Sequence, residues 1–235
     1  MDIDLTNEHY ASYMSPWVRM NANDWAPIIQ DSAMKTYPKD TVIYHQGEMT
    51  SYLYLVNEGR VCLDVYAVNG KKRSIYIADN GTCFGELSCL DQMPNYCTAV
   101  TCTQTSLYLI PRQRFLEEIQ KNSVFTLSLL RALSLKTRLI TGLLEQISFD
   151  NSHQRLYHSL IGLIQQYGQK TKEGYYQLNI KFTHQEMAYQ TGLSRVSISN
   201  MFLNLTNKGL IEKKNGYLVF KDLDALQENL IPENL

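Results

Sequence analysis

Short apolar segments with a period of two dominate the first half of the sequence. Within residues 60–66, Val61, Leu63 and Val65 alternate with more polar neighbours, which is typical of a half-buried β-strand. Asn69-Gly70 follows and is a preferred two-residue hairpin turn. We expect strands at 52–56, 60–66, 73–77, 97–101 and 105–110, with turns at Gly47, Gly59, Gly70 and Gly81. Strands and turns at this spacing predict a β-sandwich or barrel.

The pattern becomes helical after Pro111. Residues 112–147 contain no proline, and their first glycine is Gly142, so we expect helices here. One seam of positions four and three residues apart comprises Thr126, Leu130, Leu133, Thr137, Ile140, Leu144 and Ile147. Its aliphatic members predict a long helix that pairs with a second copy of itself, through Leu130, Leu133, Ile140, Leu144 and Ile147. The alternative is a helix that packs only on its own β-domain.

A second helical block follows, and its order of elements is informative. Thr183 and Glu186 have the spacing of a capping box, Gly192 permits a tight turn, and Ser194 is a good N-cap for the next helix. The first predicted element is a helix at 152–168, capped by Asn151 or Ser152 and closed by Gly168. It is followed by a strand at 175–180 and by helices at 184–190 and 195–207. The last is a hairpin of 210–213 with 217–220 around Asn215-Gly216. This order predicts a winged helix-turn-helix.

Composition places the chain among soluble globular proteins. Its 235 residues suit two domains, because single domains cluster near about 100 to 150 residues. A net charge of −1 and a hydrophobic fraction of 44% argue against intrinsic disorder. Apolar runs fall short of the ~18 residues of a membrane span, and the acidic N-terminus does not resemble a secretory signal. We therefore expect a cytoplasmic protein without a membrane partner.

Five cysteines lie between residues 62 and 102. An odd number in a cytoplasmic chain argues against a disulfide framework, so we expect all of them to be reduced. They are Cys62, Cys83, Cys89, Cys97 and Cys102, and no two have C-x-x-C spacing. Small core or pocket thiols are therefore favoured over a metal or redox site, and we expect no metal and no cofactor.

Charge separates one region of the C-terminal block from the rest. Residues 181–221 hold six basic and two acidic side chains, an excess of four positive charges. The basic residues are Lys181, Arg195, Lys208, Lys213, Lys214 and Lys221, and the acidic ones are Glu186 and Glu212. Such an excess is often only a solvated surface, but here it coincides with the predicted helix-turn-helix. It favours contacts with DNA phosphates.

The predicted helix at 195–207 would supply the contacts to bases. A period of 3.6 turns Ile198, Met201, Phe202 and Leu205 inward. The expected DNA contacts are Thr183, Gln185, Arg195, Val196, Ser197, Ser199 and Asn200. Arginine can bind guanine through two acceptors, asparagine can do the same with adenine, and valine can contact a thymine methyl group. The alternative is an ordinary exposed start of a helix.

Several motifs follow one another in the sequence: Phe84-Gly85-Glu86-Leu87, a long predicted helix, Thr183-His184-Gln185-Glu186-Met187-Ala188, Gly192-Leu193-Ser194-Arg195 and Ser197-Ile198-Ser199. In this order they resemble the Crp/Fnr family of bacterial transcription regulators. The resemblance covers nearly the whole chain. It implies an α+β protein with an effector-sensing β-roll of the double-stranded β-helix or jelly-roll type at 1–120, a dimerisation helix and hinge at 121–150, and a winged helix-turn-helix at 151–235. It also implies a homodimer on a palindromic double-stranded DNA site, with RNA polymerase as a partner.

The sequence departs from the well-known branches of that family. Members that bind cyclic AMP carry an arginine, which pairs with the cyclic phosphate, where Tyr96 stands here. Losing that charge-assisted bond costs about 1.5 to 3 kcal/mol, so we do not expect cyclic AMP binding. The first 61 residues contain no cysteine, which argues against an iron–sulfur sensor, and His45 has no evident partner for haem.

The effector pocket implied by the resemblance is neutral and partly aromatic. Its residues would be Gly85, Glu86, Leu87, Tyr96, Cys97, Thr98, Thr137, Ile140 and Thr141. Such a lining would suit a small organic effector, or side chains would fill it in a regulator that needs none.

Two other classes of function are alternatives to a DNA-binding regulator. A cupin-type enzyme would need clustered metal ligands, but the histidines, His9, His45, His153, His158 and His184, are scattered. We therefore do not expect an enzyme. A small-molecule sensor or interaction module that does not bind DNA is the remaining alternative, and the salt dependence of a gel shift separates it from a regulator.

Overall fold

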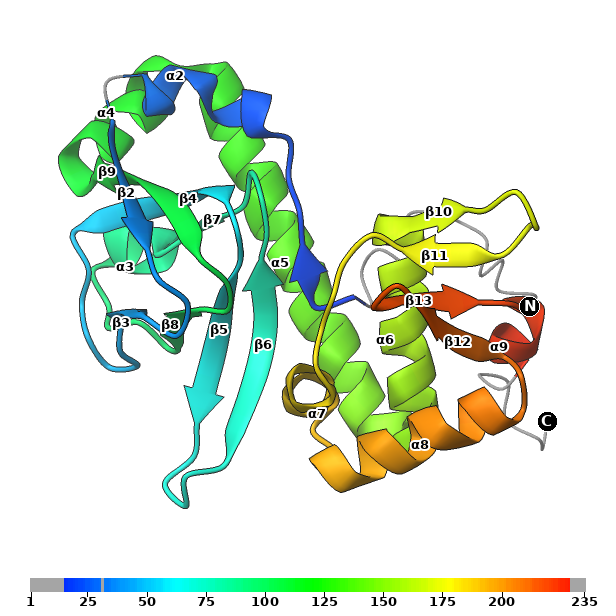
Figure 1. Ribbon diagram of the computed structural model, residues 1–235. Helices are drawn as coiled ribbons and strands as arrows, with labels where there is room; N and C mark the ends of the chain where they lie inside the picture. The colour runs from blue at the N-terminus through cyan, green and yellow to red at the C-terminus, as the bar shows by residue number, and fades with distance from the viewer. Residues whose placement is uncertain (1–14, 31, 229–235) are drawn as a thin grey trace. The chain divides into compact units, whose positions relative to one another are not determined.

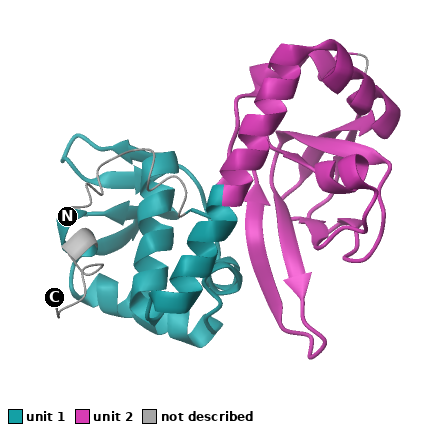
Figure 2. Cartoon of the chain, turned by 180° about the vertical axis from the view of Figure 1, so that it is seen from behind, with its two compact units in different colours: residues 1–16, 138–235 teal, residues 17–137 magenta. Residues whose placement is uncertain are grey.

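The computed structural model describes residues 15–30 and 32–228, which form two compact units (Figure 2). One unit comprises residues 17–137, and the other the described residues of 1–16 and 138–235. The boundary falls within one long helix, α5 (Ser123–Phe149), so the chain passes from one unit to the other without a loop. Among residues 15–30 and 32–228, no helix is both long and apolar enough to cross a membrane.

The N-terminal unit is a β-roll of two sheets (Figure 1). One sheet has the strand order β1-β6-β5-β8-β3 and the other β2-β9-β4-β7. The strands are β1 (Trp17–Val18), β2 (Ala33–Tyr37), β3 (Val42–Tyr44), β4 (Tyr52–Glu58), β5 (Val61–Tyr66), β6 (Lys72–Ala78), β7 (Cys83–Phe84), β8 (Thr98–Thr101) and β9 (Thr105–Pro111). The five strands expected from the period of two correspond to β4, β5, β6, β8 and β9.

Glycine turns set the lengths of these strands. Gly59 and Gly81 have φ angles of +90° and +76°, in the left-handed region that favours glycine. At both positions a Cβ atom would also collide with backbone, at Gln104 and Met20 respectively. Gly47 and Gly70 likewise have positive φ angles, so the evenly spaced glycines mark turns as predicted.

A cluster of aromatic side chains joins the roll to the helices of this unit. These helices are η1 (Ala22–Trp25), α2 (Ala26–Ile29), α3 (Glu86–Asp91), α4 (Arg112–Lys121) and the first part of α5. Phe125 is fully buried and meets Trp25 and Phe115 edge to face, with ring centroids 5.8 and 6.2 Å apart. Trp25 also donates from its indole nitrogen to the carbonyl of Gly81 at 2.7 Å.

The helical region after Pro111 is broken once. Asn122 lies between α4 and α5, and its side-chain oxygen accepts from the N–H of Phe125 at 3.1 Å. This cap begins α5 in a new direction, so that Phe115 and Phe125 can enter the same core cluster. The predicted dimerisation segment 121–150 therefore corresponds to one helix, α5, of 27 residues.

The expectation that all five cysteines are reduced was wrong, because Cys62 and Cys102 form a disulfide. Their strands are neighbours: Cys62 in β5 lies opposite Val100 in β8, and the N–H of Cys102 donates to the carbonyl of Arg60 at 2.8 Å. This register brings the two Cα atoms within 6.0 Å. The prediction used only the number of cysteines and an assumed compartment, and neither shows which residues of paired strands lie side by side.

The other three cysteines, Cys83, Cys89 and Cys97, are buried thiols. Burial raises the pKa of Cys83 to about 12, that of Cys89 to about 11 and that of Cys97 to about 12. They are therefore protonated at neutral pH and are poor nucleophiles. In the described part of the chain, no three His, Cys, Asp or Glu side chains come together as a metal site would need.

The C-terminal unit combines helices with one antiparallel sheet of order β10-β11-β13-β12 (Figure 1). Its elements are α6 (Ser152–Tyr167), β10 (Gly168–Lys170), β11 (Tyr176–Leu178), α7 (His184–Thr191), α8 (Arg195–Asn207), β12 (Ile211–Lys214), β13 (Tyr217–Phe220) and α9 (Asp224–Glu228). The hairpin β12–β13 is the wing that Asn215-Gly216 predicted, and α8 has the predicted bounds.

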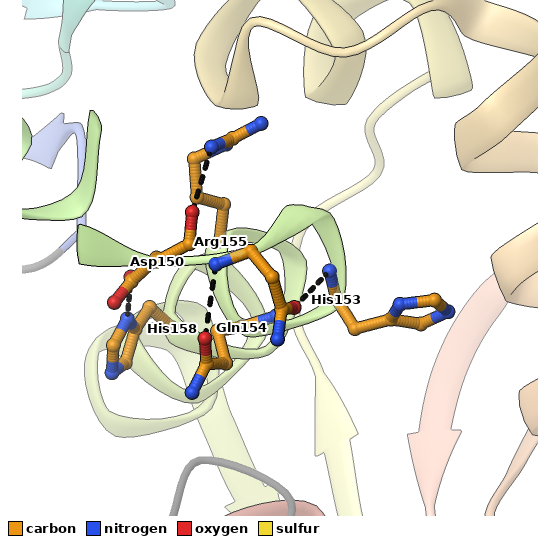
Figure 3. A network of polar contacts seen from close by, with 6 residues as sticks. Asp150, His153, Gln154, Arg155 and His158 are labelled. Atoms are coloured by element: carbon orange, nitrogen blue, oxygen red, sulfur yellow. Dashed lines mark hydrogen bonds and ion pairs between the residues drawn. The ribbon is translucent and has the colours of Figure 1, made fainter. Parts of the chain in front are cut away.

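Polar contacts fix the start of α6 (Figure 3). Asn151 is the N-cap: its side chain accepts from the N–H groups of His153 and Gln154, and Gln154 returns a bond from its side chain to the N–H of Asn151. The carboxylate of Asp150 lies 2.7 Å from Nδ1 of His158, eight residues further along the chain. The link from α5 to α6 is thus a structured turn rather than a flexible linker.

Candidate functional site

The helix-turn-helix is built by local capping bonds. Thr183 Oγ1 accepts from the N–H of Glu186 at 3.1 Å, and the Glu186 carboxylate accepts from the N–H of Thr183 at 2.6 Å. Gly192 ends α7 with a φ of +69°, and Ser194 Oγ then accepts from the N–H of Ser197 at 2.9 Å to begin α8. These caps satisfy backbone donors that would otherwise lack partners, and they fix where α8 begins.

The two faces of α8 have different environments. Ile198, Phe202 and Leu205 are buried and hold the helix on the domain, whereas Met201, which was also expected inside, is only half-buried. At the N-terminal end, Arg195, Val196 and Asn200 are exposed, and the Val196 side chain is 69% exposed. Ser197 and Ser199 are half-buried. The side chain of Val196 is therefore accessible for an apolar contact with a ligand.

Three of the expected DNA contacts already have side-chain partners within the protein, and one of them is Ser197, whose hydroxyl lies 2.8 Å from that of Ser194. Thr183 is exposed, but its hydroxyl is the N-cap of α7, and Gln185 is half-buried. Ser199 Oγ lies 2.9 Å from Nδ1 of His184, whose ring stacks on Phe202 with centroids 4.8 Å apart. Sequence reasoning missed this role of His184. Its position directly after the cap residue of α7 was the available signal.

Positive charge surrounds this surface. Burial lowers the pKa of His184, and the nearby cations of Lys213 and Arg195 lower it further, so this ring is neutral at pH 7. Lys221 forms an ion pair with Glu212 at 2.6 Å, which cancels one of the two acidic groups of the region. The remaining basic side chains give the surface around α8 the electrostatic character that phosphate contacts need.

In the N-terminal unit, Glu86 lies where the resemblance puts an effector. Gly85 adopts a φ of +81° and begins α3, so that Glu86 points into the protein and is only 2% exposed. The ammonium of Lys136, from α5, donates to Glu86 Oε1 at 2.7 Å and to the carbonyl of Cys83 at 2.7 Å. The second carboxylate oxygen of Glu86 is buried without a hydrogen-bond partner among the described residues.

Lys136 is a site residue that sequence reasoning missed. It occurs on the inner face of α5, in register with Leu129 and Ala132, which are both buried. A lysine on the apolar face of an amphipathic helix was the signal that could have found it, because a buried cation needs a buried anion. The side chain also lies over the ring of Tyr76, with Nζ 5.4 Å from the centroid.

Phenol and thiol groups complete the surroundings of Glu86. The Tyr96 hydroxyl is hydrogen-bonded with Tyr76 and with Cys97, and Tyr44 is also bonded to Cys97. Burial raises the pKa of each of these three tyrosines well above its usual value, and the negative charge of Glu86 adds to the effect. The groups are therefore neutral hydrogen-bond donors, not anions, at physiological pH.

The other expected pocket residues are less closely associated with this cluster. Thr98 is buried, but its Oγ1 accepts from the N–H of Gln46 at 2.9 Å, and Leu87 is 38% exposed. Thr137 is exposed and donates from its hydroxyl to the carbonyl of Leu133 within α5. Ile140 and Thr141 lie on the part of α5 that belongs to the C-terminal unit.

The outer face of α5 carries an exposed apolar stripe. The residues expected at a dimer interface are exposed at Leu130 (54%), Ile140 (46%), Leu144 (63%) and Ile147 (51%), and half-buried at Leu133. Isolated apolar residues are common on protein surfaces, but five large ones at seam spacing on one helix form a continuous apolar stripe.

Comparisons with known proteins agree with this architecture. The family model of the cyclic nucleotide-binding domain matches residues 34–122, and that of the Crp-like helix-turn-helix domain matches residues 154–229. The cyclic AMP receptor protein of Thermus thermophilus is 27% identical over 83% of this chain and 86% of its own length. The anaerobic regulatory protein of Bacillus subtilis is 24% identical over 86% of each chain.

Solved structures show the same fold. A CooA mutant from Carboxydothermus hydrogenoformans has a TM-score of 0.76 at 20% identity, covering 87% of this chain and 90% of its own. FixK2 from Bradyrhizobium japonicum has a TM-score of 0.73 at 17% identity, covering 87% and 99%. Together, the two domains and the relatives define a transcription regulator with a helix-turn-helix DNA-binding domain, not an enzyme. The chain belongs to the Crp/Fnr family, and the predicted fold class is confirmed.

The buried ion pair of Lys136 with Glu86 can be tested by substitution. Lys136→Met should lower the free energy of unfolding of the N-terminal unit by about 3 to 5 kcal/mol, because it leaves the Glu86 carboxylate buried and unpaired. Glu86→Gln combined with Lys136→Met should restore a large part of that loss. Urea denaturation followed by tryptophan fluorescence measures the effect, since both tryptophans, Trp17 and Trp25, lie in this unit. A single variant as stable as the unmodified protein would contradict the ion pair.

Proposed function

We propose that the protein is a homodimeric, sequence-specific regulator that binds a palindromic DNA site through α8 and responds to a small organic effector other than cyclic AMP. The observation that carries the proposal is the exposed N-terminal end of α8, which presents Arg195, Val196 and Asn200 beside basic side chains. RNA polymerase is the partner that a regulator of this family would contact, and the cytoplasm is the compartment in which it would act.

The chemistry of these three side chains supports readout of bases in the major groove. Arg195 can donate two hydrogen bonds to guanine, Asn200 can pair with the edge of adenine, and Val196 can contact a thymine methyl group. Ser197 and Ser199 would add contacts from the same helix, and Thr183 and Gln185 would reach the backbone from α7. Family members commonly carry glutamate and arginine where Val196 and Asn200 stand, so the preferred half-site should differ from theirs.

The apolar stripe on α5 supports dimerisation. Exposed leucines at Leu130 and Leu144 lie four turns apart on the outer face, while Leu129 and Ala132 already pack inside. A second copy of the same helix would cover such a stripe with a matching one, as in a two-stranded coiled coil. Two copies would also place two reading helices on the two halves of a palindrome.

The neutral cluster around Glu86 supports an effector that is not a cyclic nucleotide. Some relatives are named for cyclic AMP, such as the receptor protein of Thermus thermophilus. In this chain Tyr96 replaces the arginine that would pair with a phosphate, and the ammonium of Lys136, which lies beside Glu86, is already bound to that carboxylate. A phosphate would thus face a buried carboxylate without a free counter-charge among the groups described here.

The first prediction of this proposal concerns base readout. Arg195→Ala should cost about 1 to 3 kcal/mol of binding free energy on a duplex selected from random DNA, and should relax the preference at one base pair. Fluorescence anisotropy with labelled duplexes measures both effects. Asn204→Ala, further along α8, is the matched control and should bind as the unmodified protein does. An equal loss on selected and random DNA would make Arg195 a phosphate contact instead.

The second prediction concerns the dimer. Leu130→Glu together with Leu144→Glu should give monomers in sedimentation, because a charge at a helix seam opposes its own copy across the two-fold axis. Both side chains are more than half exposed, so the fold of each subunit should survive. Arg131→Glu, on the same helix but off the seam, is the control and should remain dimeric. A dimeric double variant would place the interface elsewhere.

The third prediction concerns the effector class. Millimolar cyclic AMP should change neither the melting temperature nor the affinity for DNA, and Tyr96→Arg should not create a response, because Lys136 still occupies Glu86. Adenosine 5′-monophosphate serves as the control for non-specific ionic effects. A thermal shift of the unmodified protein with cyclic AMP alone would overturn the assignment.

A further inference from the structure

One histidine of the C-terminal unit joins the two helices of the helix-turn-helix, where α7 meets α8 (Figure 1). His184 is the first residue of α7, and its Nδ1 lies 2.9 Å from Oγ of Ser199 in α8. Its ring also stacks on Phe202, with centroids 4.8 Å apart and an interplanar angle of 22°. The imidazole is thus held against α8, and its protonation state bears directly on Ser199.

Two cations lie on this side of the domain. Arg195 precedes Ser199 by four residues in α8, so both side chains project from the same face of that helix. Lys213 of β12 lines the same concave surface as His184 and Ser199. Burial lowers the pKa of His184, and the charges of Lys213 and Arg195 lower it further. The free protein therefore disfavours a charged imidazole at this position.

The remaining charged groups around this surface have mixed signs. The lining also contains Lys181 and Glu212, and α7 itself carries Glu186. The Glu212 carboxylate is paired with Lys221 at 2.6 Å, and the Glu186 carboxylate takes part in the capping box of α7. Both carboxylates are thus engaged by groups other than the imidazole.

DNA would bring additional negative charge to this surface. In the proposed complex, Thr183 and Gln185 reach the phosphate backbone, and they are the neighbours of His184 in the sequence. Phosphates would offset the repulsion from Arg195 and Lys213, so the charged form of His184 would be more stable in the complex than in the free protein. A group that holds its proton more tightly in a complex takes up protons as the complex forms.

Protonation would also change what Ser199 can offer to DNA. When the neutral ring carries its hydrogen on Nε2, Nδ1 can only accept, and the Ser199 hydroxyl must donate to it. A charged imidazole donates from both nitrogens, so Ser199 Oγ would become the acceptor and its own hydrogen would be released. That hydrogen could then bond to a phosphate oxygen or to an acceptor on a base edge.

We propose that His184 is a proton-linked positioning residue of the DNA interface, which takes up a proton from solvent as α8 binds DNA and thereby makes the Ser199 hydroxyl a donor toward the nucleic acid. The proposal rests on the proposed function, since it needs DNA at α8. It makes DNA affinity increase as the pH falls. The extra affinity is absent above the pKa of His184 in the complex and is complete below its lower pKa in the free protein.

Fluorescence anisotropy with a selected DNA duplex, at fixed salt and at about pH 6 and about pH 8, tests the coupling. We expect the unmodified protein to bind about threefold more tightly per chain at the lower pH, as a rise of about one unit in the pKa of one histidine would give. His184→Asn, which keeps a hydrogen-bonding group but cannot be charged, should bind equally at the two pH values. His184→Arg, which is always charged, should also lose the pH dependence but should bind more tightly than the unmodified protein at about pH 8. His153→Asn, at an exposed histidine of α6, is the matched control and should keep the full pH dependence.

Isothermal titration calorimetry in two buffers of different ionisation enthalpy counts the protons directly and needs no variant. Binding of the duplex at about pH 6 should take up a fraction of a proton per chain, and His184→Asn should abolish this uptake. A pH dependence that persists in His184→Asn, or tight binding without proton uptake, would overturn the coupling and leave the proposed function intact. A protein that binds no duplex at either pH would overturn the proposed function and this inference together.

Discussion

The buried ion pair of Lys136 with Glu86 is the constraint on which much of the N-terminal unit depends. Both charges are removed from water, and each is tolerable only because the other lies 2.7 Å away and the Cys83 carbonyl shares the ammonium. The pair fixes the rotation of α5 about its axis, since Lys136 must face the roll. With Leu129 and Ala132 on that same inner side, the helical period turns Leu130 outward, so the orientation of the exposed stripe follows from the position of one buried cation.

In the C-terminal unit, α8 is held in place by residues other than Arg195 and Asn200, which we propose as base contacts. Ile198, Phe202 and Leu205 anchor α8, and Ser194 caps it, so Arg195 and Asn200 are left to contact a ligand. Ser199 has a divided role, because His184 already engages its hydroxyl. A base contact from Ser199 would have to compete with that bond, so we expect Arg195 and Asn200 to contribute most of the discrimination between bases.

The sequence predicted those elements whose signals are local. Helix α8 was predicted with its observed bounds because Ser194 caps it and Gly192 separates it from α7, and the strands between glycine turns followed from a period of two. Helix α3 was missed because six residues are too short to show a helical period. The Cys62–Cys102 disulfide and the Lys136–Glu86 pair were missed for one reason: each joins residues 40 or more positions apart, and only the register of strands or the rotation of a helix brings them together.

The internal cation beside Glu86 changes what an effector bound at this cluster would have to accomplish. Glu86 is already satisfied at one oxygen, so a ligand gains little by contacting it unless the ligand also displaces Lys136 or uses the unpartnered second oxygen. A ligand that displaces Lys136 from Glu86 would release the constraint on α5, whereas a ligand that uses the second oxygen of Glu86 would strengthen it. The two outcomes would bias the helix in opposite directions. In either case, only a difference in affinity between the two helix arrangements can shift their populations: a 100-fold preference is worth about 2.7 kcal/mol. We therefore expect a ligand bound by the neutral donors of Tyr44, Tyr76 and Tyr96 to bias α5 most directly through Lys136, which joins this cluster to the helix.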